Sequence, residues 1–249
     1  MSTPFNTYVF RVALEAGLTL ACALPFALIA IWQSRPRRWG LLTFVMSLVV
    51  FDFALVELPR VGDFQRHHWS WQECFLLSVV PFLVVLVAGK SMVSLGISSP
   101  LRPGWLKPSI IGGLIAVAVP VVFFALGARK KLDAEGWAFL LTMPGLAEEM
   151  MFRGVYQSLL NEALGMRWQL AHARFGWGLI ITAVLFAGSN GLVVVDPQLH
   201  ARIILPAAIA PVLLSFVAGW IRERTDSVWP CVFGHNLSNV VIPVATLLA

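Results

Sequence analysis

The chain has 249 residues, of which 58% are hydrophobic and only 12% are charged, and its formal net charge is +5. A soluble domain carries about 25% charged residues, so this composition argues against a soluble protein. The basic residues lie in short segments between long apolar runs. That pattern is typical of membrane proteins and suits lipid headgroups, and we expect no nucleic-acid partner.

The apolar runs predict the fold class. Each run has roughly 20 residues, the length that crosses a bilayer as a helix. We predict an all-α, polytopic membrane helix bundle of about eight transmembrane helices, with residues 1–249 forming a single integral membrane domain. The expected spans are 9–32, 39–58, 74–93, 109–127, 136–160, 177–195, 203–221 and 228–248. We therefore expect a multi-pass membrane protein, in the plasma or inner membrane if the source is bacterial.

The second expected span carries two acidic residues, Asp52 and Glu57. Because they are five positions apart, they do not share a helix face well. Glu57 stands at the end of the span and is expected at the membrane interface, whereas Asp52 is expected to be buried without an evident partner. The segment that follows contains His67, His68 and Trp69. It reads as an interfacial loop, with tryptophan at the level of the headgroups.

The fifth expected span contains three ionisable residues, Glu148, Glu149 and Arg153. Charged groups are costly at bilayer depth and usually face a protein interior or a water-filled cavity. Glu149 and Arg153 are four apart and can pair on one helix face. Glu148 lies about 100° around the helix from Glu149, so it faces elsewhere and can meet water. On spacing alone, one structural network of all three charges is an open alternative.

A proline and a glycine, Pro144 and Gly145, precede the acidic residues by one turn. Such a break loosens the helix and lets water or a neighbouring helix approach. The sequence therefore predicts that water or a neighbouring helix can approach just before the two glutamates.

Two further spans carry polar residues at helical spacing. His235 and Asn239 are four apart in the last span, and Phe186 and Asn190 are four apart in the sixth. The donors of His235 and Asn239 could stabilise a developing oxyanion or orient a metal or a water. Asn190 could position a water, although unlike histidine it cannot take up a proton at neutral pH. The alternatives are a packed core histidine and an ordinary interhelical hydrogen bond.

Taken together, these motifs resemble the CAAX-processing and bacteriocin-processing (CPBP) intramembrane endopeptidases, also called the Abi family. The resemblance rests on the order and spacing of Glu148-Glu149-x-x-x-Arg153, Phe186-x-x-x-Asn190 and His235-x-x-x-Asn239. It covers about residues 136–245, the motif-bearing core, while the first four spans match only as generic membrane helices. It implies a helical bundle with a water-filled chamber that hydrolyses a peptide bond near the C-terminus of a membrane-associated or membrane-anchored protein.

The resemblance also implies roles for the individual residues. Glu148 would activate the water as general base, and Glu149 would pair with Arg153 and hold the helix. His235 and Asn239 would bind the oxyanion of the tetrahedral intermediate. Members of the family are described both as metal-dependent and as glutamate-type proteases, and both descriptions stay open here.

One position departs from the family pattern. The second motif commonly ends in histidine, and here it ends in Asn190. Asparagine is a poor metal ligand, so we expect no cofactor; a zinc site would have only His235 and Glu148 as candidate ligands. We favour a glutamate-dependent mechanism in which Asn190 is the third partner. The alternative that Asn190 supports is a non-catalytic membrane scaffold or immunity protein on the same fold.

Overall fold

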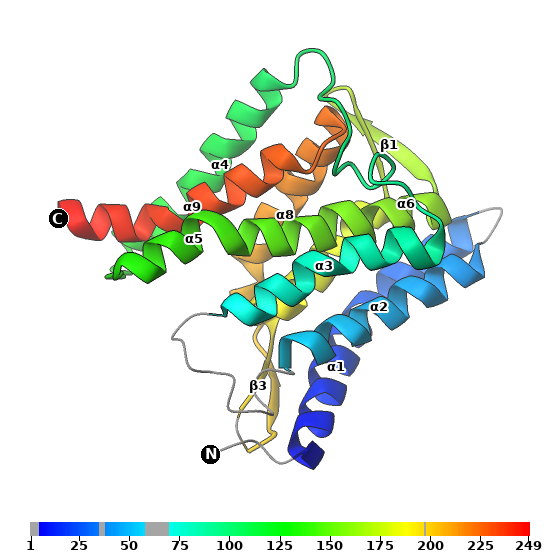
Figure 1. Ribbon diagram of the computed structural model, residues 1–249, viewed down its shortest axis with the longest axis horizontal. Coiled ribbons are helices and arrows are strands. Elements are labelled where there is room, and N and C mark those ends of the chain that lie inside the picture. The colour runs from blue at the N-terminus through cyan, green and yellow to red at the C-terminus, as the bar shows by residue number, and fades with distance from the viewer. Residues whose placement is uncertain (1–4, 35–37, 58–69, 197) are drawn as a thin grey trace.

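The computed structural model describes residues 5–34, 38–57, 70–196 and 198–249, with the side chains of Phe5 and Pro206 left aside. The predicted loop residues His67, His68 and Trp69 lie outside this part of the chain. The described residues form helices and two short hairpins, which confirms the predicted all-α class (Figure 1). The helices are α1 Phe5–Gln33, α2 Trp39–Glu57, α3 Trp71–Ala88, α4 Leu106–Ala125, α5 Ala134–Glu149, α6 Gln157–Leu164, α7 Trp177–Ala187, α8 Leu205–Thr225 and α9 Trp229–Leu248.

Five of these helices, α1 to α4 and α9, are long and apolar enough to cross a membrane by length and composition. The fifth expected span corresponds to α5, the π-helical segment η2 (Met150–Tyr156) and α6, which run through the middle of the molecule as one rod (Figure 1). The seventh corresponds to α8, whose last turn carries Arg222 and Arg224. The sixth is shorter than expected.

The sixth span was expected to continue as a helix to Val195, and that boundary is wrong. Helix α7 ends at Ala187 and passes into a π-helical turn, η3 (Gly188–Leu192), where Gly191 has φ +114°. Glycine adopts such a positive φ readily, so it can end a helix and redirect the chain. The β-branched residues that follow form β3 (Val193–Val195), which pairs antiparallel with β4 (Ala201–Ile203).

A second hairpin lies in the connection between α6 and α7. Strands β1 (Met166–Leu170) and β2 (Ala173–Gly176) pair antiparallel. The two residues that join them, Ala171 and His172, both have positive φ, as a tight hairpin turn requires. The hairpin carries α6 into α7, so two helices that face the centre of the molecule follow each other closely in the chain.

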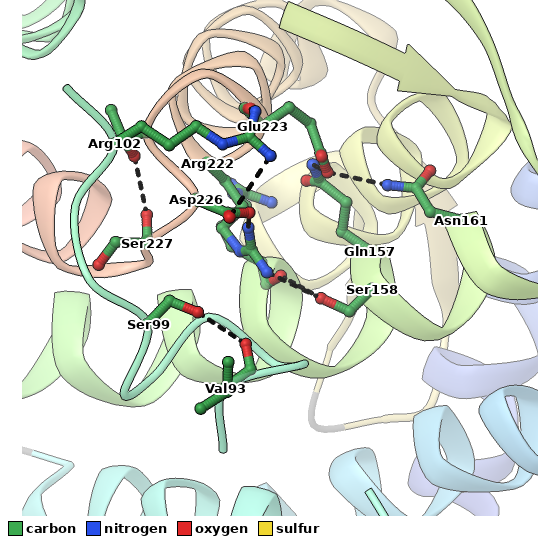
Figure 2. Close-up of polar contacts among 12 residues, drawn as sticks. Val93, Ser99, Arg102, Gln157, Ser158, Asn161, Arg222, Glu223, Asp226 and Ser227 are labelled. Carbon is green, nitrogen blue, oxygen red and sulfur yellow. Dashed lines mark hydrogen bonds and ion pairs between the residues drawn. The ribbon is translucent and has the colours of Figure 1, made fainter. Parts of the chain in front are cut away.

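A buried polar network fastens α6 to α8 (Figure 2). The side chain of Glu223 accepts hydrogen bonds from Gln157 Nε2 at 2.6 Å and from Asn161 Nδ2 at 2.8 Å. Beside it, Arg222 and Arg102 both approach Asp226, at 3.5 and 3.4 Å, which ties the connection before α4 to the end of α8. Burying a polar group without a partner is costly, so the hydrogen bonds of Glu223 help to fix how α6 and α8 meet.

Helices α5 and α9 come into close contact at Gly145, which is one of the two approaches that the break at Pro144 predicts. The backbone N–H of Gly145 donates to Asn236 Oδ1 at 2.8 Å, and Asn236 Nδ2 donates to the carbonyl oxygen of Thr142 at 3.1 Å. A Cβ atom on Gly145 would lie 2.5 Å from Asn236 Oδ1 and 2.6 Å from the carbonyl oxygen of Val232. There is thus no room for a side chain at this crossing.

Replacing Gly145 with alanine is expected to destabilise the protein by about 1–3 kcal/mol, because the extra methyl group forces α5 and α9 apart. The measurement is the thermal unfolding of the purified protein in a neutral detergent. The matched control is Gly113→Ala in α4, where an added Cβ meets no atom within 4 Å. Equal unfolding temperatures for the two variants would contradict the close approach.

Candidate active site

A buried ion pair lies at the centre of the molecule, between Glu149 and Arg153, as their four-residue spacing predicts. Arg153 Nε is 2.9 Å from Glu149 Oε2, and the two side chains are 1% and 2% exposed. The other carboxylate oxygen, Oε1, lies 2.8 Å from His235 Nδ1 on α9. Glu149 therefore joins the central rod to the last helix, a contact that spacing alone could not predict.

The contact with Glu149 orients the imidazole of His235. With Nδ1 engaged, Nε2 is the nitrogen that remains for other contacts. The ring of His235 stands edge-on to Phe186, with ring centroids 6.0 Å apart. The guanidinium carbon of Arg153 lies 5.1 Å from the centroid of the same phenyl ring. Phe186 therefore contacts both partners of Glu149 and limits their movement.

Glu148 faces a different direction from Glu149, as the helix geometry predicts. Its side chain is half-buried and has no ion pair with the residues that the structure describes. Its Oε2 atom accepts a hydrogen bond of 3.3 Å from Asn190 Nδ2. Asn190 also donates to the carbonyl oxygen of Phe186 at 3.1 Å, which sets the direction of the amide. The structure thus brings Glu148 together with Asn190.

The placement of Asn190 depends on the end of α7. Its backbone leaves helical geometry there, with φ −113° and ψ 34°, just before Gly191 turns the chain. On the other side of the contact, Glu148 lies next to the start of η2. Short π-helical segments occur frequently at functional sites, and here two of them flank one contact.

Asn190 lines two cavities. The first, which we call the histidine cavity, has a volume of about 360 Å³ and lies among α4, α5, α8 and α9. Its polar lining includes Glu149, Arg153, Asn190, His235 and Asn239. The rest of its wall is largely apolar and comes from α4, α8 and α9.

The second, which we call the acidic cavity, has a volume of about 300 Å³ and lies among α1, α2, α3, the central rod and η3. Glu148 lines this cavity, and Asn190 lines both. The candidate base and the candidate oxyanion-binding residues therefore line different cavities, and Asn190 belongs to both.

The donor set does not fit a metal centre. A catalytic zinc ion takes three protein ligands. Among the described residues, no group of three or more His, Cys, Asp or Glu side chains is placed to hold a metal ion. The candidate ligands are two, His235 and Glu148, one fewer than a catalytic zinc ion takes.

The two acidic residues of α2 have partners that the sequence did not reveal. Tyr156 donates its hydroxyl to Asp52 Oδ2 at 2.6 Å. Glu57 is the last residue of α2; its side chain is 4% exposed and lies 3.4 Å from Arg11 Nε. Both partners belong to other helices, so no spacing within α2 could indicate them.

Comparison with known proteins identifies the family of the part of the chain that contains the candidate site. Residues 131–241 match the family model described as type II CAAX prenyl endopeptidase Rce1-like. They form an Rce1-like domain. This confirms the resemblance carried by the three motifs, and it makes the chain an integral membrane protein with a CAAX-protease type of hydrolase domain. Searches of curated proteins and of solved structures found no match.

The Rce1-like domain contains all the predicted site residues, from Glu148 to Asn239. The match begins just before α5, so α1, α2, α3 and α4 lie outside it. Proteases of this family act on protein substrates at membranes, and intramembrane proteolysis in general is therefore the activity that the domain supports. The acidic cavity, in contrast, is formed only partly by this domain, because α1, α2 and α3 supply much of its wall.

Proposed function

We propose that the protein is an intramembrane endopeptidase of the glutamate type, in which Glu148 activates the water. Its substrate is a membrane-associated or membrane-anchored protein, cut near its C-terminus. The observation that carries this proposal is the difference between the contacts of the two glutamates. Glu149 engages both Arg153 and His235, whereas Glu148 has no ion pair with the described residues and faces a cavity.

The proposed reaction uses groups from both of the cavities that Asn190 lines. Glu148 takes a proton from a water, which attacks the peptide carbonyl, and later returns that proton to the leaving amine. In the imidazolium form of His235 both ring nitrogens donate, so Nε2 can donate to the oxyanion while Nδ1 remains bonded to Glu149. The amide of Asn239, on the same cavity wall, supplies a second donor.

The surrounding groups keep these side chains in place. The ion pair with Arg153 fixes Glu149, which in turn orients His235. Phe186 packs against the imidazole and the guanidinium. The apolar wall of the histidine cavity suits an apolar part of the substrate, since ligand sites are mostly apolar with a few placed polar groups. We propose that no metal takes part, because Asn190 offers an amide where a metal site would need a ligand.

A second candidate function rests on the same residue. An asparagine cannot share the proton that a histidine could, so Asn190 is also compatible with a scaffold or immunity protein that binds without cleaving. The two candidates differ in one observable, the appearance of new C-termini in membrane proteins.

The test compares cells that carry the gene with cells that lack it. Mass spectrometry of C-terminal peptides from the membrane fraction should reveal C-termini that occur only when the gene is present. The same C-termini should appear in the presence of a membrane-permeant chelator of zinc. If the two fractions show the same C-termini, the protease function is refuted and the scaffold function is favoured.

The hydrogen bond from Asn190 to Glu148 leads to a further expectation. Replacing Asn190 with alanine should lower kcat/KM for a cleaved reporter protein by about tenfold, the low end for a hydrogen bond to a charged group, because Asn190 is exposed. Asn190→His restores a donor and should keep most of the activity. A different result would be that a chelator abolishes the activity of Asn190→His and leaves that of the wild type unchanged. That result would show that the wild-type site is one ligand short of a metal centre.

A further inference from the structure

The acidic cavity has a large excess of negative groups. Among the described residues, its lining contains five carboxyl groups and one guanidinium. The carboxyl groups belong to Glu15, Asp52, Glu57, Glu73 and Glu148, and the guanidinium to Arg11. Four of the five carboxyl groups come from α1, α2 and α3, which lie outside the Rce1-like domain.

Arg11, the cation that the described residues contribute to this lining, already has partners. Arg11 Nε lies 3.1 Å from Glu15 Oε1 and 3.4 Å from Glu57 Oε2. Among the described residues, Asp52, Glu73 and Glu148 have no ion pair with a cation. Three carboxyl groups thus share a cavity of about 300 Å³ without a cation from the described residues.

Two of these three side chains are nine-tenths buried. Glu73 is 6% exposed and makes no hydrogen bond or ion pair with the described residues. Asp52 is 8% exposed, and although its Oδ2 accepts from Tyr156, its buried Oδ1 has no hydrogen-bond partner in the part of the chain that the structure describes. Burying an unpaired carboxylate is costly, so a cavity that collects several of them is suited to a positively charged ligand.

The shape of the lining distinguishes between kinds of cation. No three acidic side chains of the described residues are close enough to hold one metal ion, so they surround a space and do not converge on a point. The wall between them is apolar and includes Val49, Phe53 and Leu77. Lysine and arginine combine an apolar stem with a charged head group, and this wall matches both parts.

The position of Glu148 links this cavity to the reaction. Glu148 lines the acidic cavity, and its Oε2 is bonded to Asn190, which lines both cavities. We propose that the acidic cavity binds the side chain of a lysine or arginine of the protein substrate, close to the bond that is cut. This specificity rests on the proposed protease function, and it adds a basic residue near the cleavage site to the description of the substrate.

The test measures binding, so that it does not depend on cleavage. The probe is a fluorescein-labelled hexapeptide amide of leucine and alanine with one central lysine, and its partner probe has acetyl-lysine at that position. Fluorescence anisotropy with the full chain in a neutral detergent, read on ice, should show at least tenfold tighter binding of the lysine probe. In Asp52→Asn/Glu73→Gln that preference should fall to less than twofold, because both carboxylates are neutralised with little change of shape.

Two further variants serve as controls for the binding measurement. Glu162→Gln removes a carboxylate that pairs with Arg38 and Lys90 outside the cavity, and it should keep the tenfold preference. Glu73→Gln alone breaks no contact with the described residues and serves if the double variant does not fold; it should lower the preference at least threefold. Equal binding of the two probes to the wild type, or an unchanged preference in these cavity variants, would overturn the proposal.

A metal site would give a different result. Displacement of both probes to the same extent by Mn²⁺, without a preference for lysine, would overturn the proposal in favour of a divalent cation. The outcome is also separable from the proposed function, because the preference for lysine is a binding property. A protein that generates new C-termini but shows no preference would keep the protease function and lose the basic-residue specificity.

Discussion

The Glu148→Gln variant is expected to accumulate in the membrane at the level of the wild type and to cleave its substrate about 10²- to 10⁴-fold more slowly, the usual contribution of a general base. Glutamine keeps the size of the side chain, and its carbonyl oxygen can still accept the hydrogen bond from Asn190. It cannot take a proton from water. The measurement is the rate of appearance of the new C-terminus, normalised to the amount of protein in the membrane.

The control for this variant is Glu162→Gln on α6, which removes a carboxylate that is 37% exposed and distant from the candidate site. It should cleave at the rate of the wild type. Unchanged cleavage by Glu148→Gln at normal abundance would remove Glu148 from the mechanism. It would leave Glu149 as the only acid of the motif, although Glu149 already engages Arg153 and His235.

The division between Glu148 and Glu149 could be predicted from the sequence because it depends on local geometry. Residues four apart on a helix meet, and adjacent residues point about 100° apart. The ion pair of Glu149 with Arg153 follows from the first rule, and the exposure of Glu148 to another cavity follows from the second. The π-helical segment that begins at Met150 did not disturb either outcome.

Contacts between helices could not be predicted in the same way. Spacing within α2 says nothing about Tyr156, the partner of Asp52, or about Arg11, the partner of Glu57. The contact of Glu149 with His235 likewise joins residues that are 86 positions apart. These contacts arise only when the helices pack, and for that reason the acidic cavity was not predicted.

The end of the sixth span could not be predicted from the apolar pattern either. The run from Gly191 to Val195 is apolar enough to extend a membrane helix, yet Gly191 turns the chain and Val193–Val195 pairs with Ala201–Ile203. The apolar pattern of such a short run is the same for a helix and for a strand. The same turn places Asn190 just after the end of α7. The break that the apolar pattern did not predict therefore also positions a site residue.

The Arg153→Met variant is expected to lower the free energy of unfolding by about 3–5 kcal/mol, the usual cost of removing one partner from a buried ion pair. Glu149 would then keep its negative charge at 2% exposure with His235 as its remaining partner. Methionine fills much of the volume of the arginine stem, so the loss reports the charge more than the packing. The measurement is reversible unfolding in mixed micelles.

A double-mutant cycle separates this charge effect from other causes. Glu149→Gln added to Arg153→Met removes the unpaired carboxylate, so the double variant should be more stable than Arg153→Met alone, with a coupling of at least 1 kcal/mol in magnitude, within the range for contacting residues. Cleavage should nevertheless stay low in the double variant, because His235 loses the carboxylate that orients Nδ1. Additive effects of the two substitutions would contradict a stabilising ion pair between Glu149 and Arg153. Recovery of both stability and cleavage would instead limit Glu149 to a structural role and leave His235 oriented by Phe186 alone.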